Sequence, residues 1–181
     1  SREPKRPLIL DLVSETGHGA TATTPAEAAK RAGIVVIAVP WAGVEDSVKS
    51  LGKIPGKIVI DVTNPLDFRG GHDVEIAVPH SGAELIGTWL PGAHMVKAFN
   101  TLSWTTIKDP KQAGGPVSVP LASDDANAKQ RVTRLVAQLG LEPFDAGRLA
   151  NARYLEGMAL LYVNVQIQDP PRHFEYYLRP R

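Results

Sequence analysis

The stretch that decides the fold is Ile34-Val35-Val36-Ile37-Ala38-Val39, a continuous apolar run in which most residues are β-branched. Such a run is typical of a strand that is covered on both faces, as strands of parallel sheets are. A helix is expected just before it, because Thr24-Pro25-Ala26-Glu27 combines a capping box with proline at the first helical position. Gly33 ends this helix. The segment therefore predicts a helix that leads into a strand of a parallel sheet.

Helical and extended patterns alternate along the whole chain. The expected helices are 8–15, 24–33, 40–51, 81–90, a short one after Ser103, 125–140 and 149–166, and the expected strands are 34–39, 57–62, 94–99, 117–122 and 141–144. Residues 20–22 are expected to form a very short strand, 65–80 a long loop and 173–178 an edge strand. This βαβα rhythm predicts an α/β fold, a Rossmann-like, doubly wound and mostly parallel sheet. We expect a single NAD(P)-binding domain over 1–181, in which 149–181 forms a C-terminal helix and edge strand.

The composition narrows the classes of function. The 181 residues suit one domain, and 20 Lys and Arg against 19 Asp and Glu leave no excess charge for nucleic acid or acidic membranes. The longest mostly apolar run, 34–44, contains Pro40 and is too short to cross a bilayer. Cysteine is absent, which excludes disulfides and thiol nucleophiles, and the histidines fit no common metal-ligand spacing. We expect a cytoplasmic protein that acts on a small molecule without a metal.

Four junctions that follow predicted strands carry a family resemblance. They are Ala38-Val39-Pro40-Trp41, Ile60-Asp61-Val62-Thr63-Asn64-Pro65, Val96-Lys97-Ala98-Phe99-Asn100-Thr101 and Asp145-Ala146-Gly147-Arg148-Leu149. In this order, from Ser1 to about Leu178, the chain resembles the NADPH-dependent coenzyme F-420 reductases, the deazaflavin-linked NADP oxidoreductases. That family also resembles the soluble reductase domain of membrane metalloreductases. The resemblance implies NADP as cofactor and coenzyme F-420 or a flavin as second substrate.

The amino end departs from the family pattern. Members begin with a strand, a glycine-rich turn, a helix and a second strand that ends in Ser-Arg, and here only Ser1-Arg2 corresponds to this unit. The fold is therefore expected to be incomplete at the N-terminus by about 30 residues, with the first strand of the family lying beside residues 34–39. Three explanations are open: the chain is truncated, the segment lies outside this sequence, or another element replaces it.

The resemblance also implies roles for individual residues. Ser1, Arg2 and Lys5 would hold the extra phosphate of NADP, for which a hydroxyl, a guanidinium and an ammonium are suitable partners. The residues implied at the strand ends beside the cofactor are Ala38, Val39, Pro40, Trp41, Asn64, Ala98, Asn100 and Thr101. Asn64 would lie near the ribose or nicotinamide, Ala98 would let the ring approach, and Asn100 would bond the carboxamide or the second substrate. Each also has a structural interpretation, as an exposed charge, a turn cap or a packing residue.

The function implied is hydride transfer between NADPH and a flat deazaflavin or flavin-like ring. Such chemistry belongs to the cofactor, so no catalytic acid or base is expected, and the protein contributes binding, orientation and exclusion of water. The predicted helix 149–166 would form a wall of the acceptor pocket, the interface of a homodimer, or simply part of the core. Two other functions stay open: a non-catalytic or inactive nucleotide-binding module, and an imine or amino-acid reductase with the same nucleotide fold.

Overall fold

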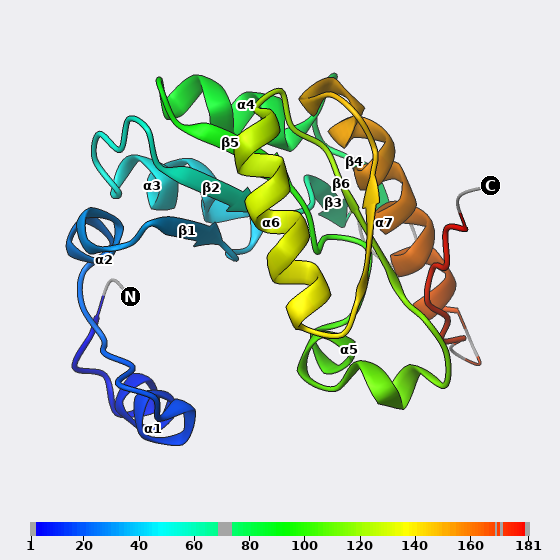
Figure 1. Cartoon of the computed structure of the whole chain (residues 1–181), viewed down its shortest axis with the longest axis horizontal. Helices are drawn as coiled ribbons and strands as arrows, with labels where there is room; N and C mark the ends of the chain where they lie inside the picture. Colours follow the sequence, from blue (N-terminus) through cyan, green and yellow to red (C-terminus); the bar gives the residue numbers. More distant parts are fainter. Residues whose placement is uncertain (1–2, 69–73, 169, 171, 180–181) are drawn as a thin grey trace.

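The centre of the fold is a three-stranded parallel sheet, seen in a computed structural model that describes residues 3–68, 74–168, 170 and 172–179. Its strands are β1 (Ile34–Ile37), β2 (Ile58–Asp61) and β5 (His94–Lys97), in the order β1-β2-β5 (Figure 1). Ile37, Asp61 and Lys97 are aligned across the three strands. The carboxyl ends therefore lie at one level, and the segments that follow them leave the sheet along one edge.

A second pair of strands extends this sheet in the opposite direction. β6 (Ser118–Leu121) and β7 (Glu142–Asp145) are parallel to each other, and an antiparallel bridge between Lys97 and Ala122 joins β6 to β5. The two main-chain hydrogen bonds of this bridge measure 2.9 and 3.1 Å. Because β6 runs opposite to β5, the next helix begins beside the amino end of β5, where the carboxylate of Asp125 lies 2.8 Å from Nδ1 of His94.

The helices begin and end close to the predicted positions. They are α1 (Pro7–Thr16), α2 (Pro25–Arg31), α3 (Val44–Lys49), α4 (Gly82–Trp89), α5 (Trp104–Lys108), α6 (Ala126–Gln138) and α7 (Ala152–Gln166), with 3-10 turns at Trp41–Gly43, Pro110–Ala113 and Leu149–Asn151. Both predicted N-caps are present: Thr24 Oγ1 accepts from Glu27 N at 3.3 Å, and Ser81 Oγ accepts from Glu84 N at 3.1 Å. Among the described helices, none combines the length and apolar character that crossing a membrane requires.

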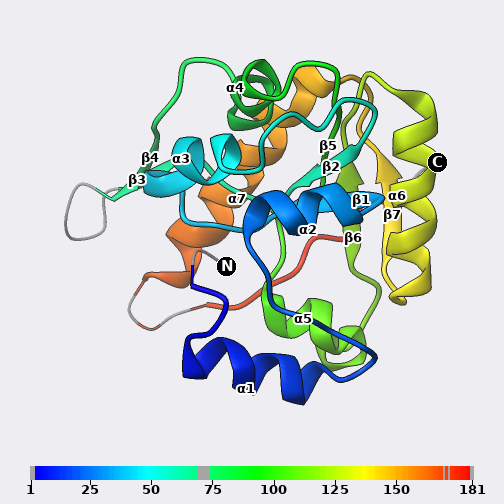
Figure 2. The same cartoon turned by 90° about the vertical axis from the view of Figure 1, so that its left-hand side faces the viewer.

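Helices cover both faces of the sheet, as expected for a doubly wound fold. On one face, Val35, Val59 and Met95 pack in a cluster with residues of α2, α3 and α4. On the other face, Ile60 and Val96 pack in a cluster with residues of β6 and α6. Figure 2 shows α6 on one side of the strands and α3 and α4 on the other. The α/β, Rossmann-like architecture predicted from the sequence is confirmed.

The sheet is less enclosed at β1 than the apolar run predicted. Val36 is 55% exposed, and among the described residues β1 pairs only with β2. The residues of α1 contribute nothing to the buried core, and Leu8, Leu10 and Leu12 are exposed. Figures 1 and 2 show this helix standing apart from the strands. The prediction that the strand over residues 34–39 is covered on both faces was therefore wrong for the face that carries Val36.

Three segments differ from the sequence-based expectation. Residues 20–22 are extended but pair with no strand, and 172–179 are irregular rather than an edge strand. The C-terminal segment nevertheless lies beside the start of β6, because Ser118 N donates to Tyr176 O at 2.8 Å. The expected loop 65–80 contains an antiparallel pair, β3 (Leu66–Phe68) and β4 (Val74–Ile76). These strands are only three residues long, so they leave little periodic signal in the sequence.

Candidate functional site

Two asparagines join the turns that follow β2 and β5. Asn64 Nδ2 donates to the main-chain oxygen of Asn100 at 3.0 Å, and Asn100 Nδ2 donates to Asn64 Oδ1 at 3.0 Å. Asn100 Nδ2 also donates to the main-chain oxygen of Leu155 in α7, again at 3.0 Å. We call this pair the asparagine clamp. It holds two neighbouring strand ends and α7 together at the carboxyl edge of the sheet, where ligands of open α/β sheets bind.

The turn that carries Asn100 has an unusual backbone. Phe99 has a φ of 63°, a left-handed conformation that is uncommon for residues other than glycine. A residue held in this region costs about 1–3 kcal/mol and persists only where its surroundings fix it. Among the described residues, Asn100 Oδ1 and Thr101 Oγ1 are buried without a hydrogen-bond partner. The strained turn thus holds two buried hydrogen-bonding atoms that no described residue uses.

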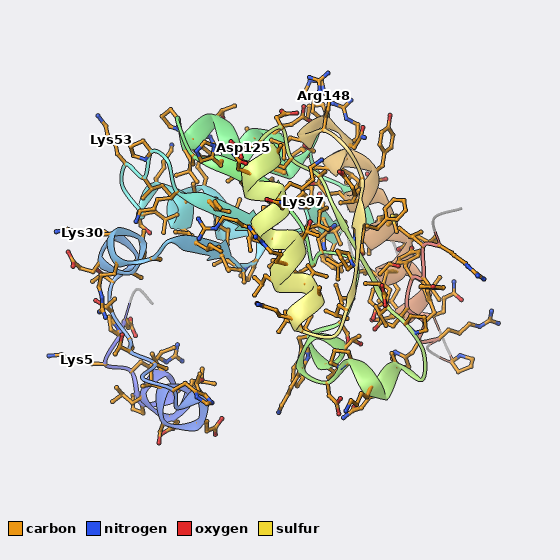
Figure 3. All side chains as sticks on the ribbon, viewed as in Figure 1. Lys5, Lys30, Lys53, Lys97, Asp125 and Arg148 are labelled. Atoms are coloured by element: carbon orange, nitrogen blue, oxygen red, sulfur yellow. The ribbon has the colours of Figure 1, made fainter. Side chains whose placement is uncertain are left out.

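A buried charged network lies beside the clamp. Lys97, at the end of β5, is fully buried, and its Nζ lies 2.9 Å from Asp61 Oδ2 and 2.9 Å from Glu156 Oε1. Nζ also donates to the main-chain oxygen of Thr63 at 2.5 Å. Figure 3 shows Lys97 inside the molecule, whereas Lys5, Lys30 and Lys53 point outward. We refer to Asp61, Lys97 and Glu156 as the buried network.

Both carboxylates of the network have further donors. Asp61 Oδ1 accepts from the main-chain N of Thr63 at 2.9 Å and from its hydroxyl at 2.7 Å. Glu156 reaches the start of α4, where it accepts from Gly82 N at 3.0 Å and Ala83 N at 3.3 Å. Burial raises the pKa of Glu156, although Lys97 and the N–H of Gly82 act in the opposite direction. The network therefore connects β2, β5, α4 and α7 through hydrogen-bonded charges.

Trp41 closes the space above the start of α4. A Cβ added at Gly82 would lie 2.9 Å from Cζ3 of Trp41 and 3.3 Å from Glu156 Oε1. Only glycine leaves room for the indole ring at this approach. Trp41 follows β1, so all three parallel strands send a residue towards the buried network or the clamp.

An apolar groove of about 410 Å³ runs along the open side of β1. It lies between α2 and α3, and its lining is Pro25, Ala28, Ala29, Ala32, Ile34, Val35, Val36, Ile37, Ala38, Val39, Ser47, Val48, Ser50 and Leu51. Ala38 and Val39, two of the residues that the sequence placed beside the cofactor, belong to this lining. The groove therefore adjoins the carboxyl edge.

The other predicted site residues have different surroundings. Ser1 and Arg2 lie outside the described residues, and Lys5 is exposed near α1. Pro40 is exposed, whereas Trp41 and Asn64 are half-buried and Asn100 is buried. Ala98 is fully buried in the core cluster of β2, β5 and β6, so in this structure its side chain is not open to a ligand. No group of residues suited to a metal is found in the described part of the chain.

Sequence reasoning missed the buried network. Its signal was present, because Asp61 and Lys97 each stand at the end of an apolar run and Glu156 stands within an apolar helix. A charged residue in such a position is almost never buried unless it is paired. The presence of one charged residue in each of three apolar elements could therefore have been used to predict that the three side chains pair with one another.

The parallel sheet with helices on both faces and polar residues after its strands defines a Rossmann-like protein. Comparisons with known proteins agree with this class. Residues 1–65 match the family model described as NADP oxidoreductase coenzyme F420-dependent. The F420-dependent NADP reductase of Methanothermobacter marburgensis is 29% identical over 174 residues, which cover 91% of this chain and 76% of that enzyme. A crystal structure of a proposed F420-dependent NADP reductase from Arthrobacter sp. FB24 aligns with a TM-score of 0.89 and 28% identity, over 99% of this chain and 86% of that one.

The chain is thus similar to coenzyme F420-dependent NADP oxidoreductases, through the family model over residues 1–65 and through these two relatives over most of its length. It also resembles the metalloreductase STEAP3 of Rattus norvegicus, with 32% identity over 109 residues that make up 60% of this chain and 21% of that protein. The chain thus spans about a fifth of the metalloreductases that it matches.

Proposed function

We propose that the protein is an NADP-dependent oxidoreductase that transfers a hydride between NADPH and a deazaflavin or flavin-like acceptor. The observation that carries this proposal is the asparagine clamp, which places polar groups from two strand ends at one edge of a Rossmann-like sheet. The similarity to F420-dependent NADP reductases supports the same activity.

The unpartnered atoms at this edge have the chemistry to bind a nicotinamide carboxamide. Asn100 Oδ1 and Thr101 Oγ1 have no partner among the described residues, and both can accept a hydrogen bond. Both atoms are buried in this structure, so the proposal requires that the turn moves when the carboxamide binds. NADPH supplies the hydride when it is bound. The clamp then orients the ring, and the packed strand ends exclude water from it. Ala98 acts from the core behind this edge, and its small volume determines how closely the strands approach.

The phosphate end of the cofactor is proposed to lie towards the amino end of the chain. Lys5 is exposed and can approach a phosphate, and Ser1 and Arg2 precede it in the sequence. The apolar groove along β1 supports a further strand at the open edge of the sheet, because among the described residues β1 pairs with β2 alone and its other side can bond to a strand. A glycine-rich turn on that strand would complete the pyrophosphate site.

The acceptor is proposed to lie against α7. This helix contacts the clamp through Leu155 and the buried network through Glu156, so it borders the same edge. The methanogen relative is named an F420-dependent NADP reductase, so its name pairs coenzyme F420 with NADP. A flat conjugated ring can stack on the nicotinamide while α7 forms one wall.

We also propose a cytoplasmic homodimer. Tyr154 and Leu161 are 67% and 54% exposed on α7, and exposed apolar side chains on one helix favour an interface with a second copy. Light scattering coupled to gel filtration tests the dimer. A mass of one chain at micromolar concentration would contradict it.

Nucleotide titration tests the proposed function. Residues 1–181 and a version extended at its amino end by a strand, glycine-rich turn and helix are titrated with NADPH and with NADH, and bound versions are assayed for reduction of coenzyme F420. We expect the extended version to prefer NADPH and to reduce the deazaflavin. A non-catalytic nucleotide-binding module is the second candidate, because among the described residues none of the turns after β1, β2 and β5 is glycine-rich. That candidate is favoured if nucleotide binds without turnover, and both fail if neither version binds.

A further inference from the structure

The buried network has no evident value as a source of stability. Asp61, Lys97 and Glu156 are all 0% exposed. Removing charges from water costs free energy that their mutual attraction repays only in part, and apolar replacements of such groups are often neutral or stabilising. The contacts of the network suggest another role, because its members bond to main-chain groups on two separate segments, the turn after β2 and the start of α4.

The first of these contacts fixes the turn that carries Asn64. Lys97 Nζ donates to the main-chain oxygen of Thr63, the residue immediately before Asn64. Asp61 holds the same residue from the other side through its N–H and hydroxyl. Charged groups therefore bond to both the N–H and the carbonyl of Thr63 in the turn after β2. These bonds fix the position of the next residue, Asn64.

The second contact fixes α7. Leu155 and Glu156 are consecutive residues, and they bond to Asn100 and Lys97 respectively. Glu156 continues to the first N–H groups of α4. The helix is thus tied to the end of β5 at two adjacent points, on either side of the strained Phe99 turn.

We propose that Asp61, Lys97 and Glu156 are positioning residues for hydride transfer. They set the asparagine clamp and α7 relative to each other before any ligand binds, and thereby fix the distance and angle between the two reacting rings. This inference rests on the proposed function. Misplacement of reacting groups by about 1 Å can cost on the order of a hundredfold in rate.

The variant that tests this combines Lys97→Met with Glu156→Gln. The net charge of the network is −1 with all three groups ionised, from one ammonium and two carboxylates, and it remains −1 with Asp61 alone. Both replacements are close in size to the native side chains, but Asp61 keeps its buried charge without the ammonium, so the double variant is expected to be less stable than wild type. If the double variant is unfolded by circular dichroism, Glu156→Gln alone takes its place, because its amide oxygen can still accept from Gly82.

Lys129→Met is the matched control. Lys129 Nζ bonds to Asp145 Oδ1 and to the main-chain oxygen of Gly147, both at 2.7 Å. Its side chain is 15% exposed, so it too is a largely buried lysine with a carboxylate and a carbonyl partner. It lies on α6, one turn from Asp125, at the amino end of β5 and away from the clamp.

The first readout needs no nucleotide. The side-chain amide signals of Asn64 and Asn100 are followed by NMR in the full chain, together with thermal unfolding. We expect both pairs of signals to shift and to exchange faster with solvent in the double variant, and to be unchanged in Lys129→Met. Unchanged amide signals in the folded double variant, or equal changes in the control, would overturn the positioning role.

The second readout uses an enzyme version that binds NADPH. Relative to wild type, we expect kcat of the double variant to fall by about tenfold or more while the Kd for NADPH changes by less than about twofold, the pattern of lost orientation rather than lost binding. Equal kcat values would overturn the inference. If no version binds NADPH, the proposed function fails, and the amide signals still decide whether the network sets the clamp.

Discussion

Asn100 holds the clamp with one amide group. Its Nδ2 bonds to both Asn64 Oδ1 and the oxygen of Leu155, and it is 6% exposed. Replacing it with aspartate keeps the shape but removes both donors and leaves a carboxylate facing two acceptors. We expect Asn100→Asp to lose about 1–3 kcal/mol of unfolding free energy, measured by urea denaturation.

The control for this change is Asn127→Asp, which alters an exposed residue of α6. It should stay within about 0.5 kcal/mol of wild type. Equal stability of Asn100→Asp and wild type would mean that the clamp bonds contribute nothing.

Glu156 gives the buried network a dependence on pH. Burial raises its pKa above the ordinary 4.5, so between that value and the raised one the native state holds more protons than the unfolded state. The contribution of Glu156 to the free energy of unfolding therefore falls as the pH rises through that window. We expect the melting temperature of Glu156→Gln, relative to wild type, to improve as the pH rises from 4.5 towards the raised pKa. A constant difference, or one that changes in the opposite direction, would contradict the raised pKa.

Residues at strand ends could be predicted, but their partners could not. The family resemblance placed Asn64 and Asn100 at the strand ends, which is where ligands of open α/β sheets bind. The sequence did not show that Leu155 would meet Asn100, because the two are 55 positions apart and only the packing of α7 brings them together. Ala98 was placed beside the ring on family grounds, and its side chain instead fills the core.

At the scale of elements, the start of α4 depends on a single glycine. A Cβ at Gly82 would lie 2.9 Å from the ring of Trp41, well inside ordinary contact distance. Gly82→Ala must push the indole or the helix aside, which we expect to cost about 1–3 kcal/mol of unfolding free energy. Urea denaturation followed by tryptophan fluorescence measures this cost.

Gly157→Ala provides the opposite case within α7. A Cβ there meets nothing within 4 Å, and the residue is exposed in the helix. Alanine should therefore stabilise this variant by about 0.5–1 kcal/mol. If both substitutions changed stability in the same direction, the close approach of Trp41 to α4 would not be the cause.

Elements with strong periodic or capping signals were predicted well, and weak ones were not. The capping boxes at Thr24 and Ser81 begin helices where expected. β1 was predicted from its apolar run, but that run does not reveal whether a neighbour covers Val36. The hairpin of β3 and β4 was predicted as a loop because its strands are too short for alternation to be visible.

For the whole molecule, order along the chain predicted the architecture. The alternation of helices and strands gave a doubly wound sheet with cores on both faces, as found. The reversed direction of β6 and β7 was not predicted, because helical and extended patterns carry no sign of strand direction. The direction of β6 depends on the connection from β5 through α5, after which the chain runs back antiparallel to β5.

The central claim is that the strand ends carrying Asn64 and Asn100 receive the nicotinamide of NADPH. The most direct measurement is a titration of the NADPH-binding version of the protein, followed by NMR of the side-chain amides of these two residues. The account predicts saturable shifts of both signals with NADPH, and none with adenosine 2′,5′-bisphosphate, which lacks the nicotinamide. Saturable binding of NADPH that leaves both signals unmoved would contradict it.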